Sequence, residues 1–280
     1  MTTPHTVDHR IAPAAGPVSR LRHAVTDIAA VTRRDLLHWA ADPTPVIVNL
    51  LFPIMLVLMF GYLFGGAMTV PGGGDYREFL LPGMFAMTML FGLESTVLAV
   101  TTDAARGVTD RFRSLPIAGS AVLGGRAVAD LIDSTARLAV VMLCGLAVGW
   151  RWHGGLAAAA AAVALLLLLR LAFIWVGVYL GLLLRTPASA AAVQILVWPA
   201  GFLSNAFVAP ETMPAPLAAA AEWNPMSATV TAARALFDNP GWEGQSFAAQ
   251  HAVTMAVAWP LLLSAVFIPL ALRRYRRLSR

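Results

Sequence analysis

The feature that most constrains this chain is a series of six apolar runs, each about as long as the ~20 residues that a helix needs to cross a bilayer. They cover residues 45–66, 79–100, 127–150, 155–184, 189–209 and 251–272. Hydrophobic residues make up 58% of the chain and charged residues only 12%, whereas an average soluble domain carries about 25% charged residues. The composition excludes a soluble globular protein and predicts an all-α, polytopic membrane protein with six transmembrane helices.

The segments outside these runs complete the predicted organisation. Residues 1–18 are rich in proline, alanine and threonine without apolar periodicity, which predicts a disordered tail and no signal peptide. Residues 19–44 place apolar side chains at helical spacing among arginines, which favours an amphipathic helix at the membrane interface; a helix packed on a soluble partner is the alternative. The predicted transmembrane domain spans 45–272, and a basic tail follows at 273–280.

Arginine distribution sets the expected orientation. All 20 basic residues are arginine, and the formal net charge is +5. Fifteen of them lie in the N-terminal segment, in the loop 101–126, at position 185 or in the C-terminal tail, against three in the loops on the other side. Because positively charged loops stay in the cytoplasm, both termini and the loop 101–126 are predicted to be cytoplasmic, with the chain in the cell membrane. Apolar spans separate these arginine clusters, so no nucleic-acid partner is expected.

A polar island interrupts the apolar runs at residues 101–116. Its charges exclude it from the bilayer core. Val108, Phe112 and Leu115 recur at i, i+4 and i+7, so they would share one face of a short helix that Pro116 ends. The island is therefore predicted to be a short amphipathic helix that docks on something outside the membrane.

Several kinds of chemistry lack the residues that they need. Because the chain has no lysine, it cannot form a Walker A phosphate loop or a lysine Schiff base. Its six histidines are scattered, and no Gly-x-Ser-x-Gly motif accompanies them, so neither a metal centre nor a serine hydrolase is expected. The sequence predicts no enzymatic activity, metal or cofactor in this chain.

Four charged side chains fall inside the predicted spans at similar depth. They are Glu94, Asp133, Arg137 and Arg170. Asp133 and Arg137 are four residues apart and can pair on one helix, whereas Glu94 and Arg170 would pair across helices. This intramembrane polar belt is predicted either to line or support a transport passage or to be a structural pairing that fixes helix packing.

The loop 210–250 is the longest on the predicted outer side. Its two apolar stretches, 213–221 and 227–237, are too short to cross a bilayer. Asn224 can cap a helix and Pro225 suits a first turn, which predicts a helix over 225–236. The two stretches either dip into the outer leaflet as short helices or form a helical pair outside it.

Three Gly-x-x-x-Gly pairs begin at Gly61, Gly145 and Gly177. Such pairs allow two helix backbones to approach closely. At least one of the three is expected to pack within the chain.

Two stretches carry a resemblance to a known family. The first is the island, with the candidate coupling residues Arg106, Gly107, Val108, Asp110, Arg111, Phe112, Arg113, Leu115 and Pro116. The second follows the fifth run, with the residues Ser204, Asn205, Phe207, Met213, Pro214, Asn224, Pro225 and Arg234. In these motifs the chain resembles the membrane permease subunits of type-2 ABC exporters, and within them the daunorubicin/doxorubicin-resistance permease group.

The resemblance implies a pump that contains two six-span subunits and two ABC ATPase subunits. The second permease copy would be identical or different, and ATP and Mg would bind in the partner ATPase. The island would be the coupling helix that rides in a groove of the ATPase, and the cargo would be a hydrophobic or amphipathic drug, polyketide or lipid. One alternative is a proton-coupled secondary multidrug transporter in which Glu94 and Asp133 take up and release the proton. Another is a membrane-embedded enzyme, against which the missing catalytic constellation counts.

Overall fold

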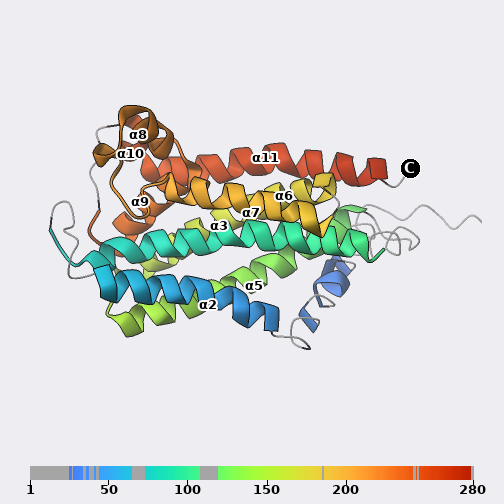
Figure 1. The fold of residues 1–280 in the computed structure, drawn as a ribbon, viewed down its shortest axis with the longest axis horizontal. Coiled ribbons are helices and arrows are strands. Elements are labelled where there is room, and N and C mark those ends of the chain that lie inside the picture. The colour runs from blue at the N-terminus through green and yellow to red at the C-terminus, as the bar shows by residue number, and fades with distance from the viewer. Residues whose placement is uncertain are drawn as a thin grey trace, which may run out of the picture.

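The computed structural model describes residues 25–26, 28–33, 36–37, 41, 44–64, 73–107, 119–184, 186–241, 244 and 246–278. The disordered tail predicted for residues 1–18 lies outside these residues. Within them, every regular element is helical (Figure 1). The longer helices are α2 (Thr44–Leu58), which continues into the π-helical turn η1 (Met59–Phe64), α3 (Tyr76–Ala105), α5 (Gly119–Val148), α6 (Gly155–Leu184), α7 (Pro187–Phe202) and α11 (Ala252–Leu278). The shorter ones are η2 (Pro210–Thr212), α8 (Ala215–Glu222), α9 (Pro225–Phe237) and α10 (Phe247–Gln250).

Four of the described helices are long and apolar enough to cross a membrane, namely α3, α5 from Ser120, α6 and α11. Two shorter apolar helices lie at Leu50–Tyr62 and Ala188–Phe202. The predicted all-helical, multi-pass membrane architecture is therefore confirmed, while the crossing of all six runs stays a prediction.

The fifth apolar run forms a shorter helix than the sequence predicts. Helix α7 ends at Phe202, whereas the run extends to residue 209. The amide of Leu203 donates to the carbonyl of Pro199 (2.7 Å), and the hydroxyl of Ser204 folds back onto the carbonyl of Gly201. Hydropathy could not show this local turn, because it measures composition and not backbone hydrogen bonding.

Helices α2, α3, α5, α6, α7 and α11 run lengthwise side by side, and α8, α9 and α10 gather at one end of the bundle (Figure 1). The C-terminus, the end of α3 and the start of α5 lie at the opposite end (Figure 1). Helix α6 is central, since it packs extensively against α3, α11 and α9. Helix α11 runs through to Leu278, so the arginines at positions 273–277 of the predicted basic tail lie on the last helix.

Aromatic side chains fill the core near α9. Trp150 is completely buried, and its ring meets Phe85 and Phe237 edge to face, with centroids 5.0 and 5.1 Å away. The indole Nε1 donates to the side-chain oxygen of Asn239 at 2.8 Å. A buried Trp needs such a partner for its N–H, so this bond fixes the end of α5 against the segment that follows α9.

The glycines of the third Gly-x-x-x-Gly pair bring α6 close to α3. A Cβ added at Gly181 would lie 2.6 Å from the Cβ of Val100, and one added at Gly177 would lie 3.0 Å from the Cβ of Thr96. This contact confirms that at least one of the predicted pairs packs within the chain.

The substitution Gly181→Ala is expected to destabilise the bundle. Its new methyl group would overlap the β-branched Val100, which cannot swing away, so the helices must separate at a cost of about 1–3 kcal/mol in the free energy of unfolding. Thermal unfolding of the purified protein measures the loss. Gly124→Ala is the matched control, because its Cβ would meet only the end of the Ile28 side chain, at 3.4 Å; equal losses in both variants would contradict the prediction.

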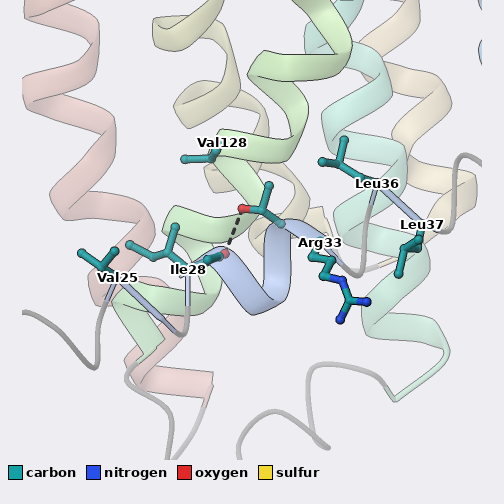
Figure 2. Close-up of a pocket in the computed structure, with 8 residues that line it drawn as sticks. Val25, Ile28, Arg33, Leu36, Leu37 and Val128 are labelled. Atoms are coloured by element: carbon teal, nitrogen blue, oxygen red, sulfur yellow. Dashed lines mark hydrogen bonds between the residues drawn. The ribbon is translucent and has the colours of Figure 1, made fainter.

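The N-terminal segment packs on the start of α5. Val31 is buried, and the hydroxyl of Thr32 donates to the carbonyl of Gly125 at 3.1 Å. Figure 2 shows the apolar groove that this segment forms with α5, where Val25 and Ile28 lie on one side, Leu36 and Leu37 on the other, and Val128 above. The predicted amphipathic segment 19–44 therefore packs on α5 through Ile28 and Val31, while Val25 and Leu37 stay more than half exposed. Its placement at a membrane interface stays a prediction.

Candidate functional site

The polar island begins at the last turn of α3. Helix α3 ends at Ala105, Arg106 caps it, and Gly107 follows in the left-handed region with φ of 67°, which glycine adopts at little cost. The rest of the island lies outside the described residues, so the coupling roles of Val108, Asp110, Arg111, Phe112, Arg113, Leu115 and Pro116 stay predictions.

The two helices that flank the island are joined by ion pairs. Arg126 on α5 donates through Nη1 to Asp103 on α3 (3.1 Å) and through Nε to Asp130 on α5 (3.0 Å). The Asp130 carboxylate then accepts a hydrogen bond from the hydroxyl of Thr96 on α3 at 2.7 Å. Because Asp130 is only 5% exposed, its bond to Thr96 operates in a low-dielectric interior, where it holds α3 and α5 together more strongly than a surface contact would.

Arg170 on α6 joins the same set of bonds. Its guanidinium donates through Nη2 to the hydroxyl of Thr96 (2.9 Å) and through Nε to the hydroxyl of Ser134 (2.6 Å), and it is only 2% exposed. Gly92 makes room for it, because a Cβ there would lie 2.6 Å from the guanidinium carbon. We call this connected set the buried polar chain; its members are Asp103, Arg126, Asp130, Thr96, Ser134 and Arg170.

Of the two pairings predicted for the polar belt, one is present and the other is not, while the role of the belt stays a prediction. Arg137 donates to Asp133 at 2.6 Å on the same helix, as expected. Glu94, however, is not a partner of Arg170, and within the described helices its carboxylate makes no hydrogen bond or ion pair. The reason is the face on which it lies: two residues along a helix turn a side chain by about 200°, and Thr96 occupies the face toward α6.

Sequence analysis missed the residues that Arg170 does contact. A signal was present on α5, where Arg126, Asp130 and Ser134 follow one another at intervals of four and so share one face of a helix. Thr96 carried no comparable signal, because a lone threonine in an apolar helix usually bonds to its own backbone.

The second candidate constellation lies at the other end of the bundle, around Arg234 on α9. Its guanidinium donates to three backbone carbonyls, those of Phe79 (2.8 Å), Asn205 (3.0 Å) and Ala206 (2.9 Å), and it lies 3.8 Å from the centre of the Phe79 ring. Burial lowers the pKa of Arg234 to about 9, so the group remains charged at neutral pH. One side chain thus fastens α9 to the first turn of α3 and to the turn after α7.

Polar side chains of the same motif secure the turn after α7. The backbone amide of Asn205 donates to the hydroxyl of Ser227 (3.0 Å), and its side-chain amide donates to the hydroxyl of Thr231 (2.6 Å). Asn224 caps α9 by accepting from the amide of Met226, and it donates to the carbonyl of Leu203 (2.6 Å). The predicted helix over 225–236 with its Asn cap is confirmed, since α9 spans Pro225–Phe237.

The remaining residues of the outer motif lie at the edge of this constellation. Phe207 stacks on Phe202 with ring centroids 5.0 Å apart. Met213 ends η2 and is half-buried, and Pro214 precedes α8 and is exposed. The motif residues therefore hold the outer helices in place; among the described contacts they form no catalytic arrangement.

These features define a multi-pass membrane protein with charged side chains joining α3 and α5 at one end of its bundle and a set of short helices held by Arg234 at the other. Residues 26–237 match the ABC-2 type transporter family. The chain is also 32% identical over 278 residues to the daunorubicin resistance ABC transporter permease protein DrrB1 of Streptomyces coeruleorubidus, with 98% of this chain and 95% of that protein covered. The chain belongs to the ABC-2 type transporter family, as the motifs in the sequence predicted.

Proposed function

We propose that this chain is the permease subunit of an ATP-driven exporter that moves hydrophobic or amphipathic molecules out of the cell. The nearly full-length similarity to a daunorubicin resistance permease carries the proposal. This similarity supports a drug, polyketide or lipid as the class of cargo. The apolar composition of the spans suits such a molecule.

The energy source in this proposal is a separate ABC ATPase subunit that binds ATP and Mg. The chain has no lysine with which to build its own Walker A loop. The charged loop 108–118, together with Arg106 and Gly107, is the proposed docking surface for that ATPase. The end of α3 and the start of α5, which flank it, lie at the end of the bundle where α11 also ends (Figure 1), and the arginine-rich segments support a cytoplasmic position for this end.

A second permease copy completes the proposed transporter, as either a homodimer or a heterodimer. Many apolar side chains on the outside of the bundle are exposed, among them Ile195 (71%) and Leu196 (70%) on α7. Such surfaces suit lipid tails and a neighbouring copy equally well, so the surface supports a membrane setting without selecting the dimer contact.

Isolation of the protein from its native host in mild detergent tests the proposal. We expect an ABC ATPase to copurify, and the reconstituted complex to accumulate a fluorescent anthracycline in vesicles when ATP and Mg²⁺ are added. A proton gradient without ATP is the control condition. If the gradient alone drove uptake and no ATPase copurified, the proton-coupled alternative that uses Glu94 and Asp133 would replace this proposal.

A further inference from the structure

We propose that the buried polar chain couples the facing ends of α3 and α5, which flank the proposed docking segment, to the transmembrane helix α6. This inference rests on the proposed function, because it assigns the route by which a docked ATPase would act on the spans. It adds a coupling role for the six residues of the buried polar chain, all of which lie on helices α3, α5 and α6.

The buried polar chain starts where α3 ends and α5 begins. Asp103 lies in the last turn of α3, and Arg126 lies two turns into α5, so the ion pair between them (3.1 Å) ties together the two helices that flank the loop. Arg126 is also bonded to Asp130. Any sliding of α3 along α5 must therefore strain or break the pair between Asp103 and Arg126.

The middle of the chain runs about 10 Å deeper along α3, the rise from Asp103 to Thr96. The hydroxyl of Thr96 donates to Asp130 and accepts from Arg170. Ser134 acts in the same manner, since its hydroxyl donates to the carbonyl of Asp130 (2.7 Å) and accepts from Arg170. Each hydroxyl has a single proton. Thr96 also has the carbonyl of Gly92 on its own helix within reach at 3.1 Å, but the Asp130 carboxylate is nearer, at 2.7 Å, and is charged, so it is the stronger acceptor.

The far end of the buried polar chain is the charged guanidinium of Arg170, which bonds to neutral hydroxyls. Arg170 meets Thr96 and Ser134 in place of a carboxylate, and its Nη1 makes no hydrogen bond to a described protein group. A buried donor without a partner costs about 1–3 kcal/mol. The guanidinium can recover that free energy if α5 or α3 shifts and offers it Asp130 directly, which gives Arg170 two arrangements that sliding of α3 against α5 can select.

The neighbouring Asp133–Arg137 pair shows what a connection of this kind requires. Both residues lie on α5, and within the described residues neither bonds to another helix. The polar chain instead connects α3, α5 and α6 in sequence. A two-state contact between elements can carry coupling, whereas a pair inside one rigid helix moves with that helix.

Thr96→Val tests the central link, because valine keeps the shape and removes the hydroxyl. In the complex with its ATPase we expect ATP hydrolysis to persist while cargo moved per ATP falls about fivefold or more. Thr96→Ser, which restores the hydroxyl, should recover the ratio. Ser134→Ala is the second variant that breaks the route to Arg170, and it keeps the test decisive if Thr96→Val does not fold.

Thr88→Val and Thr101→Val are matched controls on the same helix. Both threonines are buried, and their hydroxyls bond to carbonyls of α3 itself, those of Met84 (2.9 Å) and of Val97 (3.0 Å). The controls should keep the wild-type ratio of transport to ATP hydrolysis. An unchanged ratio in Thr96→Val and Ser134→Ala, or the same loss in the controls, would overturn the proposal.

A double-mutant cycle tests the chain in the permease alone. Asp103→Asn alters the near end of the buried polar chain and Ser134→Ala alters the link to Arg170; the two residues do not contact each other, and sites that share no partner usually have additive effects. We expect the fall in melting temperature of the double variant to differ from the sum of the single falls. Additive falls would overturn the transmission route even in a complex that exports with ATP. A wild-type complex that ignores ATP would instead refute the proposed function.

Discussion

Arg234→Met is expected to cause the largest loss of stability of any single substitution at the outer end of the bundle. Methionine fills a comparable volume and donates no hydrogen bond. The carbonyls of Phe79, Asn205 and Ala206 would then lose their donor in a site where Arg234 is only 2% exposed. Each buried acceptor left without a partner costs about 1–3 kcal/mol, so the free energy of unfolding should fall by about 3 kcal/mol or more.

Thermal unfolding of the purified protein, with membrane yield as a second readout, checks this expectation. Arg151→Met is the matched control, since Arg151 is exposed and, among the described residues, its guanidinium donates to the nearby carbonyls of Leu146 and Trp150 alone. Arg234→Lys should be intermediate, because it keeps the charge but cannot reach all three carbonyls. A melting temperature of Arg234→Met equal to that of Arg151→Met would show that the clasp does not hold the outer helices.

Reversing two charges of the island, with Arg111→Glu and Arg113→Glu together, is expected to abolish ATP-driven export and leave the protein in the membrane. Both arginines fall in the loop that the proposed function assigns to ATPase docking. Two reversals change the local charge by four, and like-charge contacts at an interface cost several kcal/mol. Copurification of the ATPase and vesicle uptake measure the two parts of the effect.

Two arginines near the C-terminus supply the control for this double variant. Arg276→Glu with Arg277→Glu changes the charge equally on the last turns of α11, away from the island in sequence. Export should survive there far better than in the island variant. Wild-type uptake by the island variant would remove the docking role and leave Phe112 and its apolar neighbours without a partner.

The depth of a residue along its helix could be predicted from the sequence, but the neighbouring helix that its side chain faces could not. Glu94 and Arg170 lie at similar depth, which suggested a pair, but Arg170 bonds to Ser134 on α5 and to Thr96 on the α3 face that also carries Gly92. The prediction used the rise per residue correctly and had no information on the rotation of one helix against another. The prediction of the Asp133–Arg137 pair was right because both residues lie on one helix, where spacing alone fixes the contact.

The sequence by itself determined the features that depend on neighbouring residues. Hydropathy gave the membrane class, the Asn224–Pro225 cap gave the start of α9, and the 177/181 glycine spacing gave a close helix contact. Only the tertiary structure decided the partners of the buried arginines, since Arg234 meets a carbonyl 155 positions away and Arg170 a hydroxyl 74 positions away. A buried guanidinium must find acceptors somewhere, but which backbone or hydroxyl supplies them depends on how the finished helices rotate and cross.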